Sequence, residues 1–270
     1  MMRQGNSVTV TGQRPAVEPA DGGATGTVRL AGVSKVFGRG SSAVRALDQI
    51  SLDVPPGEFT CLIGASGCGK STLLSLVAGL EEPTAGRVSV SGRVALMFQE
   101  PALFPWLTAA GNVELALRAR GMGRAERRER AAELLETVHL TGFGGKRPHE
   151  LSGGMRQRVA LARALAQDAD VLLMDEPFGA LDAITRDLLH DELDLVCAGR
   201  NLTIIFVTHN VREAVRLGNR VVLLSSRPGR VVEEFAVPIE RPRRIDSAPV
   251  AELARQITDR LREVMSDANR

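Results

Sequence analysis

Short, nearly continuous apolar runs recur along the chain, separated by stretches with helical periodicity. Runs at 59–63 and 94–98 predict buried strands, and similar runs return at 171–174, 203–207 and 221–224. Strands that are apolar on both faces and alternate with helices are typical of a parallel sheet covered on both sides. The pattern therefore predicts an α/β fold with a mainly parallel sheet.

Two regions depart from this pattern. Alternating polar and apolar residues at 28–30 and 50–54 predict an antiparallel β edge subdomain, and the run 86–90 predicts a further strand. Residues from about 101 to 166 have helical periodicity and are dominated by Ala, Leu, Glu and Arg. This stretch predicts an α-helical subdomain inserted into the α/β core.

The two ends of the chain differ in composition from the core. Residues 1–26 are rich in Gly, Ala, Thr and Pro, so we expect a disordered N-terminal tail before a core domain at 27–240. Residues 241–270 predict a linker, Arg241 to Arg244, followed by an amphipathic helix. The apolar face of that helix comprises Val250, Leu253, Ala254, Ile257, Leu261 and Val264.

The segment Gly64–Ser71 carries the clearest chemical pattern in the chain, because it fits the phosphate-binding loop G-x-x-x-x-G-K-[ST]. The loop follows the predicted strand 59–63 and precedes a predicted helix at 71–78, which is the context that the motif requires. Glycines let backbone N–H groups approach a phosphate chain, and the helix start favours anions. The predicted nucleotide contacts here are Gly64, Ala65, Ser66, Gly67, Cys68, Gly69, Lys70, Ser71 and Thr72.

Composition and charge exclude some classes of function. The 270 residues contain 34 basic and 32 acidic side chains, so the chain as a whole has no electrostatic footprint for nucleic acid. No apolar run approaches the roughly 20 residues that span a bilayer. Cys61, Cys68 and Cys197 lack metal-ligand spacing and there is no export signal, so we expect reduced thiols in a bacterial cytoplasm.

Two carboxylates end the apolar run at 171–174. Asp175 stands where it could bind Mg²⁺ beside nucleotide phosphates. Glu176 is expected to point the opposite way off the strand and to activate an attacking water. Alone, the pair would fit a solvated strand end equally well, but the phosphate loop favours the catalytic interpretation.

The segment Leu151–Arg158 resembles the signature motif of ATP-binding cassette (ABC) proteins. Ser152, Gly153 and Gly154 would open a helix there and form a second anion site from a hydroxyl and free N–H groups. The residues alone do not show whose phosphate that site holds. The resemblance implies that it faces the nucleotide of a second subunit, so that a homodimer closes over two ATP molecules.

The other family motifs follow in the family's order, and the resemblance covers about Thr27 to Val237. It implies that Phe37 stacks on adenine, that Gln99 senses Mg²⁺, that Asp182 lies at the dimer interface, and that His209 contacts the γ-phosphate. The implied catalytic residues are Glu176, His209, Lys70 and Gln99. The implied Mg²⁺ ligands are Ser71, Gln99 and Asp175.

The amino-acid sequences of residues 175–186 and Ser226–Arg230 are similar to those of nitrate, sulfonate and taurine importer ATPases. This resemblance implies the ATP-hydrolysing subunit of a bacterial importer of a small anionic or polar solute, at the cytoplasmic face of the membrane. The implied partners are integral membrane permease subunits and, indirectly, a solute-binding protein. A cassette that hydrolyses ATP without coupling to transport is the alternative.

The sequence allows two interpretations for each of three further features. Trp106, in the stretch 100–107, is expected either to dock a permease helix or to be buried in the helical subdomain. The arginines at 118–130 form a solvated helix face or contact anionic lipid. Cys68 is a small space-filler, or a thiolate whose alkylation by N-ethylmaleimide inhibits the protein.

Overall fold

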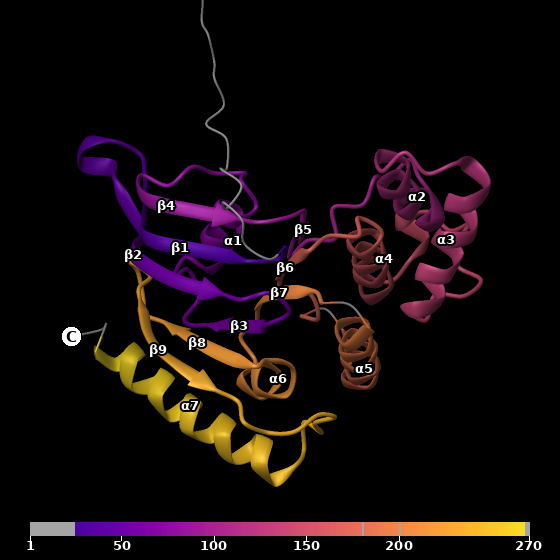
Figure 1. Ribbon diagram of the computed structural model, residues 1–270. Helices are drawn as coiled ribbons and strands as arrows, with labels where there is room; N and C mark the ends of the chain where they lie inside the picture. The colour runs from indigo at the N-terminus through magenta and orange to yellow at the C-terminus, as the bar shows by residue number, and fades with distance from the viewer. Residues whose placement is uncertain (1–24, 180, 200, 268–270) are drawn as a thin grey trace, which may run out of the picture.

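Alternate residues of the central strands face opposite sides of one sheet, and each side has its own hydrophobic core. The strands and helices are drawn in Figure 1. The computed structural model describes residues 25–179, 181–199 and 201–267. Five strands run parallel, and the last pairs antiparallel with its neighbour. The order is β5 (Val94–Met97), β6 (Val171–Asp175), β7 (Thr203–Val207), β3 (Phe59–Ile63), β8 (Arg220–Leu224) and β9 (Val231–Ala236).

A second sheet covers one face of the first. Its antiparallel order is β2 (Val44–Val54), β1 (Val28–Phe37) and β4 (Ala85–Val90). Helix α1 (Lys70–Val77) shares the core between the sheets, which includes Leu62 of β3, Leu173 of β6 and Leu224 of β8. The predicted α/β class and antiparallel edge are both confirmed.

Helices cover the other face of the six-stranded sheet. Their core takes the alternate strand residues, such as Cys61, Met174 and Phe206. The helices that contribute to it are α2 (Ala109–Ala119), α3 (Arg124–Thr137), α4 (Gly153–Leu165), α5 (Ala183–Gly199), α6 (Val211–Leu217) and α7 (Ala248–Asp267). Short 3-10 turns occur at Gly40–Ser42 and Pro148–Glu150. None of the helices in the described parts of the chain is long and apolar enough to span a bilayer.

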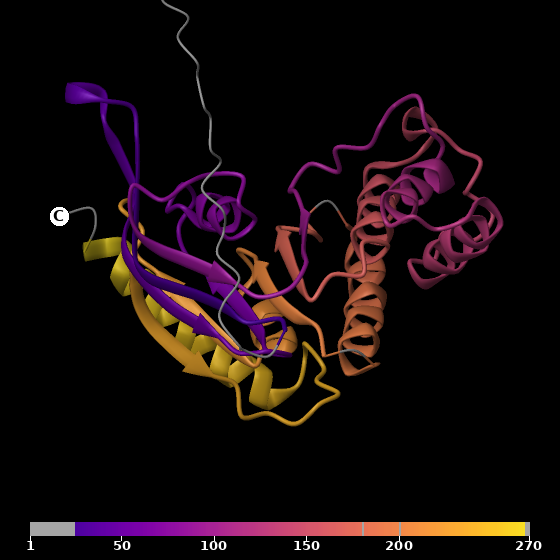
Figure 2. The same cartoon turned by 45° about the horizontal axis from the view of Figure 1, so that its top comes forward.

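Helices α2, α3 and α4 pack on one another beside the sheets, within the stretch predicted to be an inserted helical subdomain (Figure 2). Helix α7 lies within the stretch predicted to hold a C-terminal amphipathic helix, and it packs on α6. Val250, Ala254 and Ile257 are buried on its apolar face. The expected disordered tail falls mostly on residues 1–24, which lie outside the described residues, as do 268–270.

The stretch 241–244, predicted to be a linker, has no helix or strand but is tied to the core. Arg243 is only 5% exposed, and burial lowers its pKa to about 10. Its guanidinium donates to the backbone oxygens of Val215 at 2.9 Å, Gly218 at 2.6 Å and Val237 at 3.1 Å. Buried carbonyls need donors, so this arginine joins β9 and the approach to α7 to the end of α6.

We expect Arg243→Leu to destabilise the protein by about 3 kcal/mol, because several buried carbonyls would lose their donor. Chemical denaturation measures the free energy of unfolding. The control is Arg244→Leu, since Arg244 is exposed and bonds the side chain of Asp246. Equal stabilities of the two variants would contradict the structural role of Arg243.

Candidate functional site

The phosphate loop lies between β3 and α1, and its backbone admits only glycine at one critical position. Gly69 has φ 102°, and a Cβ there would lie 2.6 Å from Leu47 Cδ2 and 2.9 Å from the Ala46 oxygen. Lys70 is 7% exposed, and its ammonium donates to the oxygens of Gly64 at 2.9 Å and Ala65 at 3.0 Å. The first N–H groups of α1 have no partner within the helix. The loop thus presents a cation and free donors, as an anion site requires.

A cavity of about 360 Å³ opens beside this loop. Its lining joins the phosphate loop to the end of β1, the start of β2, the loop after β5 and the end of β6. The lining residues are Phe37, Val44, Ala46, Ser66, Gly67, Gly69, Lys70, Ser71, Thr72, Gln99, Asp175, Glu176 and Arg227. Gly64, Ala65 and Cys68 lie in the loop but are not among them.

Phe37 is an exposed aromatic at one end of the cavity, not a core residue. Its side chain is 40% exposed, and the Lys35 ammonium lies 5.0 Å from the ring centre. An exposed ring face beside a phosphate loop can stack on a nucleotide base. The geometry is therefore compatible with the predicted contact to adenine.

Asp175 and Glu176 both face this cavity, which corrects the expectation that they point in opposite directions. Glu176 has φ 44°, so it has left the extended conformation in which side chains alternate. Burial raises the pKa of the Asp175 carboxyl, while a hydrogen bond from Ser71 acts in the opposite direction. The oxygens of Asp175 and Ser71 therefore lie next to each other, as ligands of one hard cation would. Burial disfavours the charged form of the Asp175 carboxyl, and a bound cation would stabilise that form.

Glu176 forms contacts with two other predicted site residues. Its Oε2 lies 3.1 Å from His209 Nδ1 and accepts from Gln99 Nε2 at 3.5 Å. His209 is otherwise exposed, since 69% of its side chain is accessible. Residues from the ends of β5, β6 and β7 therefore converge at the carboxyl edge of the sheet.

The remaining predicted contacts do not line this cavity. Ser152 caps α4 by accepting from the Met155 N–H at 3.2 Å, and Gly153 and Gly154 form the first turn of that helix. Asp182 caps α5 through the Thr185 N–H at 3.0 Å, a bond that lowers the pKa of its carboxyl. Ser152, Gly153, Gly154 and Asp182 therefore do not line the cavity beside the phosphate loop of the same chain. Ala180, beside Asp182, lies outside the described residues.

The structure adds Arg227, which in the sequence belongs only to the segment Ser226–Arg230 that resembles importer ATPases. Its Nε donates to the Gly67 oxygen at 3.3 Å, and its side chain lines the cavity. The neighbouring Gly229 packs so closely that a Cβ would lie 2.1 Å from the Cys68 oxygen. The only local signal was the pair Pro228-Gly229, which indicates a turn but not its contact with a loop 160 residues away.

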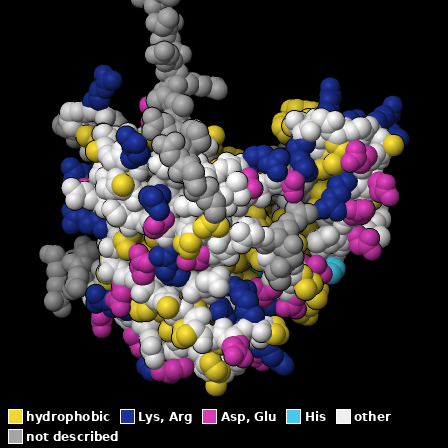
Figure 3. All heavy atoms as spheres, in the orientation of Figure 1, with side chains coloured by type: hydrophobic (Ala, Val, Ile, Leu, Met, Phe, Trp, Pro, Cys, Tyr) yellow, Lys and Arg dark blue, Asp and Glu magenta, His cyan; other side chains and the backbone are white. Residues whose placement is uncertain are grey.

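A second, larger concavity of about 740 Å³ lies between α1, β5 and the helices α2 and α4. Leu80, Phe98, Phe104 and Leu115 line it and are exposed. Figure 3 shows hydrophobic side chains in the hollow between the sheets and the helices. Trp106, beside it, is 68% exposed, so the interpretation that it is buried is wrong.

The loop that runs along this concavity from Pro101 to Phe104 is fixed at both ends. Arg163 of α4 donates to the oxygens of Pro101 at 2.9 Å and Ala102 at 2.8 Å. Asn112 is fully buried, accepts from the Phe104 N–H at 2.8 Å and donates to nearby carbonyls. An apolar concavity with a held loop is suited to docking another protein.

Known proteins similar to this chain share one description. Residues 47–179 match the family described as ABC transporter. An uncharacterized ABC transporter ATP-binding protein of Methanocaldococcus jannaschii is 42% identical over 87% of this chain and 91% of its own. A taurine import ATP-binding protein of Burkholderia pseudomallei is 48% identical over 77% of this chain and 84% of its own. An aliphatic sulfonates import ATP-binding protein of Mesorhizobium japonicum is 45% identical over 85% of this chain and 86% of its own.

Solved structures agree with these sequences. A dimeric ATP-binding cassette in a post-hydrolysis state, bound to ADP and phosphate, is 34% identical and superposes with a TM-score of 0.74. The match covers 79% of this chain and all of the other. A second dimeric structure, of a bacterial ABC transporter cassette, gives the same values.

The burial of the cysteines predicts that none reacts in the native state. Cys68 is 1% exposed and Cys61 is fully buried, while burial raises the pKa of the partly exposed Cys197 to about 12. A reagent needs an accessible thiolate. Mass spectrometry after N-ethylmaleimide treatment at neutral pH should show no label on the native protein and three labels after denaturation. Rapid native labelling of Cys68 would instead support the reactive-thiol interpretation.

Proposed function

Since the chain belongs to the ABC transporter family of ATPases, we propose that it is the ATP-hydrolysing subunit of a bacterial importer of a small anionic or polar solute. The observation that carries the proposal is the convergence of Lys70, Asp175 and Glu176 on one cavity. A phosphate-binding cation, a metal ligand and a base then surround the position of a γ-phosphate. That combination suits phosphoryl transfer to water.

ATP binding uses the residues along the cavity from Phe37 to Lys70. The Phe37 ring stacks on adenine, and the N–H groups at the start of α1 surround the phosphates. The Lys70 ammonium exchanges its bonds to the Gly64 and Ala65 oxygens for bonds to phosphate oxygens. Arg227, next to Gly67, adds a second cation to the same cavity.

Mg²⁺ fits the oxygen donors that the site offers. Ser71, Gln99 and Asp175 would hold it, as hard oxygen ligands do. When bound, the ion supplies charge that offsets the repulsion between phosphate and carboxylates. The chain's own contribution is to keep the Asp175 carboxyl half-buried and beside Ser71.

Hydrolysis begins at Glu176. Its carboxylate takes a proton from the attacking water, whose oxygen forms a bond to the γ-phosphorus as the bond to the ADP oxygen breaks. His209 contacts Glu176 at 3.1 Å and is exposed toward the cavity edge, where it holds the γ-phosphate. Gln99 reaches the same carboxylate and is bonded to α4 through Gln157, which links the site to the helical subdomain.

A second copy of the chain completes the site. The exposed Ser152 and the half-buried Gly153 and Gly154 form a helix start that lies outside their own chain's cavity. Such a helix start binds anions, so we infer that it holds the γ-phosphate of the other subunit, with Asp182 at the interface. The dimeric state of the related cassette bound to ADP and phosphate supports this arrangement.

The apolar concavity near Leu115 is where membrane subunits would dock. We propose that separate permease subunits move the solute and hold this ATPase at the cytoplasmic face of the membrane. Relatives named for taurine and aliphatic sulfonate import support a small anionic or polar solute and, indirectly, a solute-binding protein. Failure of the chain to purify with any polytopic membrane protein would favour an ATPase that is not coupled to transport.

We expect Glu176→Gln to bind ATP but to lose more than about 99% of its turnover, because the amide cannot accept the proton. ATP binding is measured by fluorescence titration, turnover by phosphate release, and the mass by light scattering, which should show a dimer with ATP. In contrast, Lys70→Ala should lose both binding and turnover. Turnover by Glu176→Gln close to that of the wild type would remove Glu176 from its assigned role.

We expect Leu115→Glu to abolish co-purification with the permease and ATP-driven uptake, because it places a charge in an apolar docking surface. Phosphate release by the isolated subunit should change less than about twofold, since Leu115 lies outside the nucleotide cavity. Leu195→Glu, at an exposed position on α5, is the matched control. Normal uptake with Leu115→Glu would rule out this surface.

A further inference from the structure

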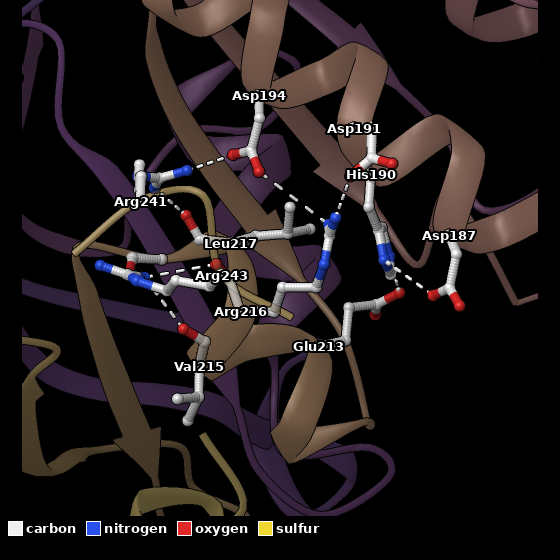
Figure 4. A network of polar contacts seen from close by, with 11 residues as sticks. Asp187, His190, Asp191, Asp194, Glu213, Val215, Arg216, Leu217, Arg241 and Arg243 are labelled. Carbon is white, nitrogen blue, oxygen red and sulfur yellow. Dashed lines mark hydrogen bonds and ion pairs between the residues drawn. The ribbon is translucent and has the colours of Figure 1, made fainter. Parts of the chain in front are cut away.

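A buried series of polar side chains connects α5 to the segment that carries His209. Figure 4 shows its first contact, between His190 and Glu213. His190 of α5 is fully buried, and its Nε2 lies 2.9 Å from Glu213 Oε1. Glu213, in the first turn of α6, is 4% exposed, and its other oxygen accepts from the Thr208 hydroxyl. None of these three residues has a role in the proposed mechanism.

These polar contacts extend to both backbone neighbours of His209. Thr208 precedes it, and the Thr208 hydroxyl accepts from the Asn210 N–H at 3.0 Å. Asn210 in turn caps α6 by accepting from the Glu213 N–H at 3.2 Å. The backbone of His209 is therefore fixed on each side by groups that contact Glu213.

His190 also contacts the segment that carries Glu176. Its ring meets the edge of the Phe178 ring, with centres 5.1 Å apart. Phe178 is two residues after Glu176, in a turn closed by a bond from the Gly179 N–H to the Glu176 oxygen at 3.2 Å. The buried imidazole of His190 thus contacts Glu213, which fixes the neighbours of His209, and Phe178, which lies in the turn after Glu176.

A small cavity lies where these groups meet. It has a volume of about 20 Å³ and is lined by Glu176, His209, Thr208 and Glu213 among others. This volume holds at most one water. The positions of the Glu176 and His209 side chains therefore depend directly on the packing of Thr208 and Glu213 against them.

We propose that His190 and Glu213 are positioning residues that hold His209 opposite Glu176. The proposal rests on the proposed ATPase site, because it concerns the geometry of that site. His190 gives the Glu213 carboxylate its buried donor, and Glu213 keeps Thr208 and Asn210, and with them the His209 backbone, in place. Neither side chain touches nucleotide, so their effect is on turnover and not on ATP affinity.

The same two helices have a second connection that does not reach His209. Arg216 of α6 is 5% exposed and pairs with Asp191 and Asp194 of α5 (Figure 4). Arg241 also pairs with Asp194 and so ties the chain before α7 to α5. Loss of Arg216 would weaken the packing of α5 on α6 without altering the bonds around Thr208, which makes it a matched control.

The experiment compares His190→Leu, His190→Gln and Arg216→Leu in phosphate-release assays over a range of ATP concentrations. His190→Leu should lower kcat by about ten- to a hundredfold, because small displacements of reacting groups have effects of this size. Its KM for ATP should stay within about twofold of the wild type. His190→Gln should keep most of the wild-type kcat, because its amide N–H can still donate to Glu213. Arg216→Leu should lower the melting temperature but leave kcat within about twofold.

Two results would overturn the proposal. One is a kcat for His190→Leu equal to that of the wild type. The other is equal losses of kcat in His190→Leu and Arg216→Leu, which would mean that general packing of α5 on α6 is all that His190 provides. Glu213→Gln tests the same series of contacts if His190→Leu does not fold, and it should lower kcat at unchanged KM. Absence of turnover in the wild-type protein would instead contradict the proposed function itself.

Discussion

Two carboxylates adjoin a phosphate loop in this protein, and the surrounding structure has to offset their repulsion of a nucleotide. Asp175 and Glu176 face the cavity that Lys70 and the start of α1 supply with positive charge and N–H donors. Parallel strands make this possible, because the carboxyl ends of β3, β6 and β7 meet at one edge of the sheet. The two hydrophobic cores on either face hold that edge in place.

Much of this arrangement could be predicted from local sequence. The apolar runs identified the parallel strands, and the spacing of Gly64 to Ser71 identified the phosphate loop, because strand alternation and loop geometry depend on neighbouring residues. The cap at Ser152 was predictable for the same reason.

Other features depend on contacts between distant segments, and local patterns do not reveal them. The contact of Arg227 with Gly67 and the burial of Arg243 follow from how the C-terminal part of the chain folds back onto the core. The strand β9 has two glutamates at its centre, Glu233 and Glu234, which interrupt its apolar residues, so it has no continuous apolar run to predict it. Glu176 adopts a positive φ that strand periodicity excludes, and this backbone change brings it to the same side as Asp175.

The most consequential feature is the start of α4, which lies outside the nucleotide cavity of its own chain and which we propose as an anion site for a second subunit. Two helix starts face phosphate in the proposed mechanism: α1 in one subunit and α4 in the other. The first binds the nucleotide, and the second closes over it, so binding and closure involve different residues. This separation explains how hydrolysis can be made to depend on association, and through association on a membrane partner.

The most direct test compares the molecular mass of Glu176→Gln and of the double variant Glu176→Gln/Gly154→Asp at saturating ATP. An aspartate in the first turn of α4 is compatible with the helix but repels phosphate. The account predicts a dimer for the first protein and a monomer for the second, which still binds ATP at its own phosphate loop. A double variant that still dimerises, or that no longer binds ATP as a monomer, would contradict the claim that α4 completes the site of a second subunit.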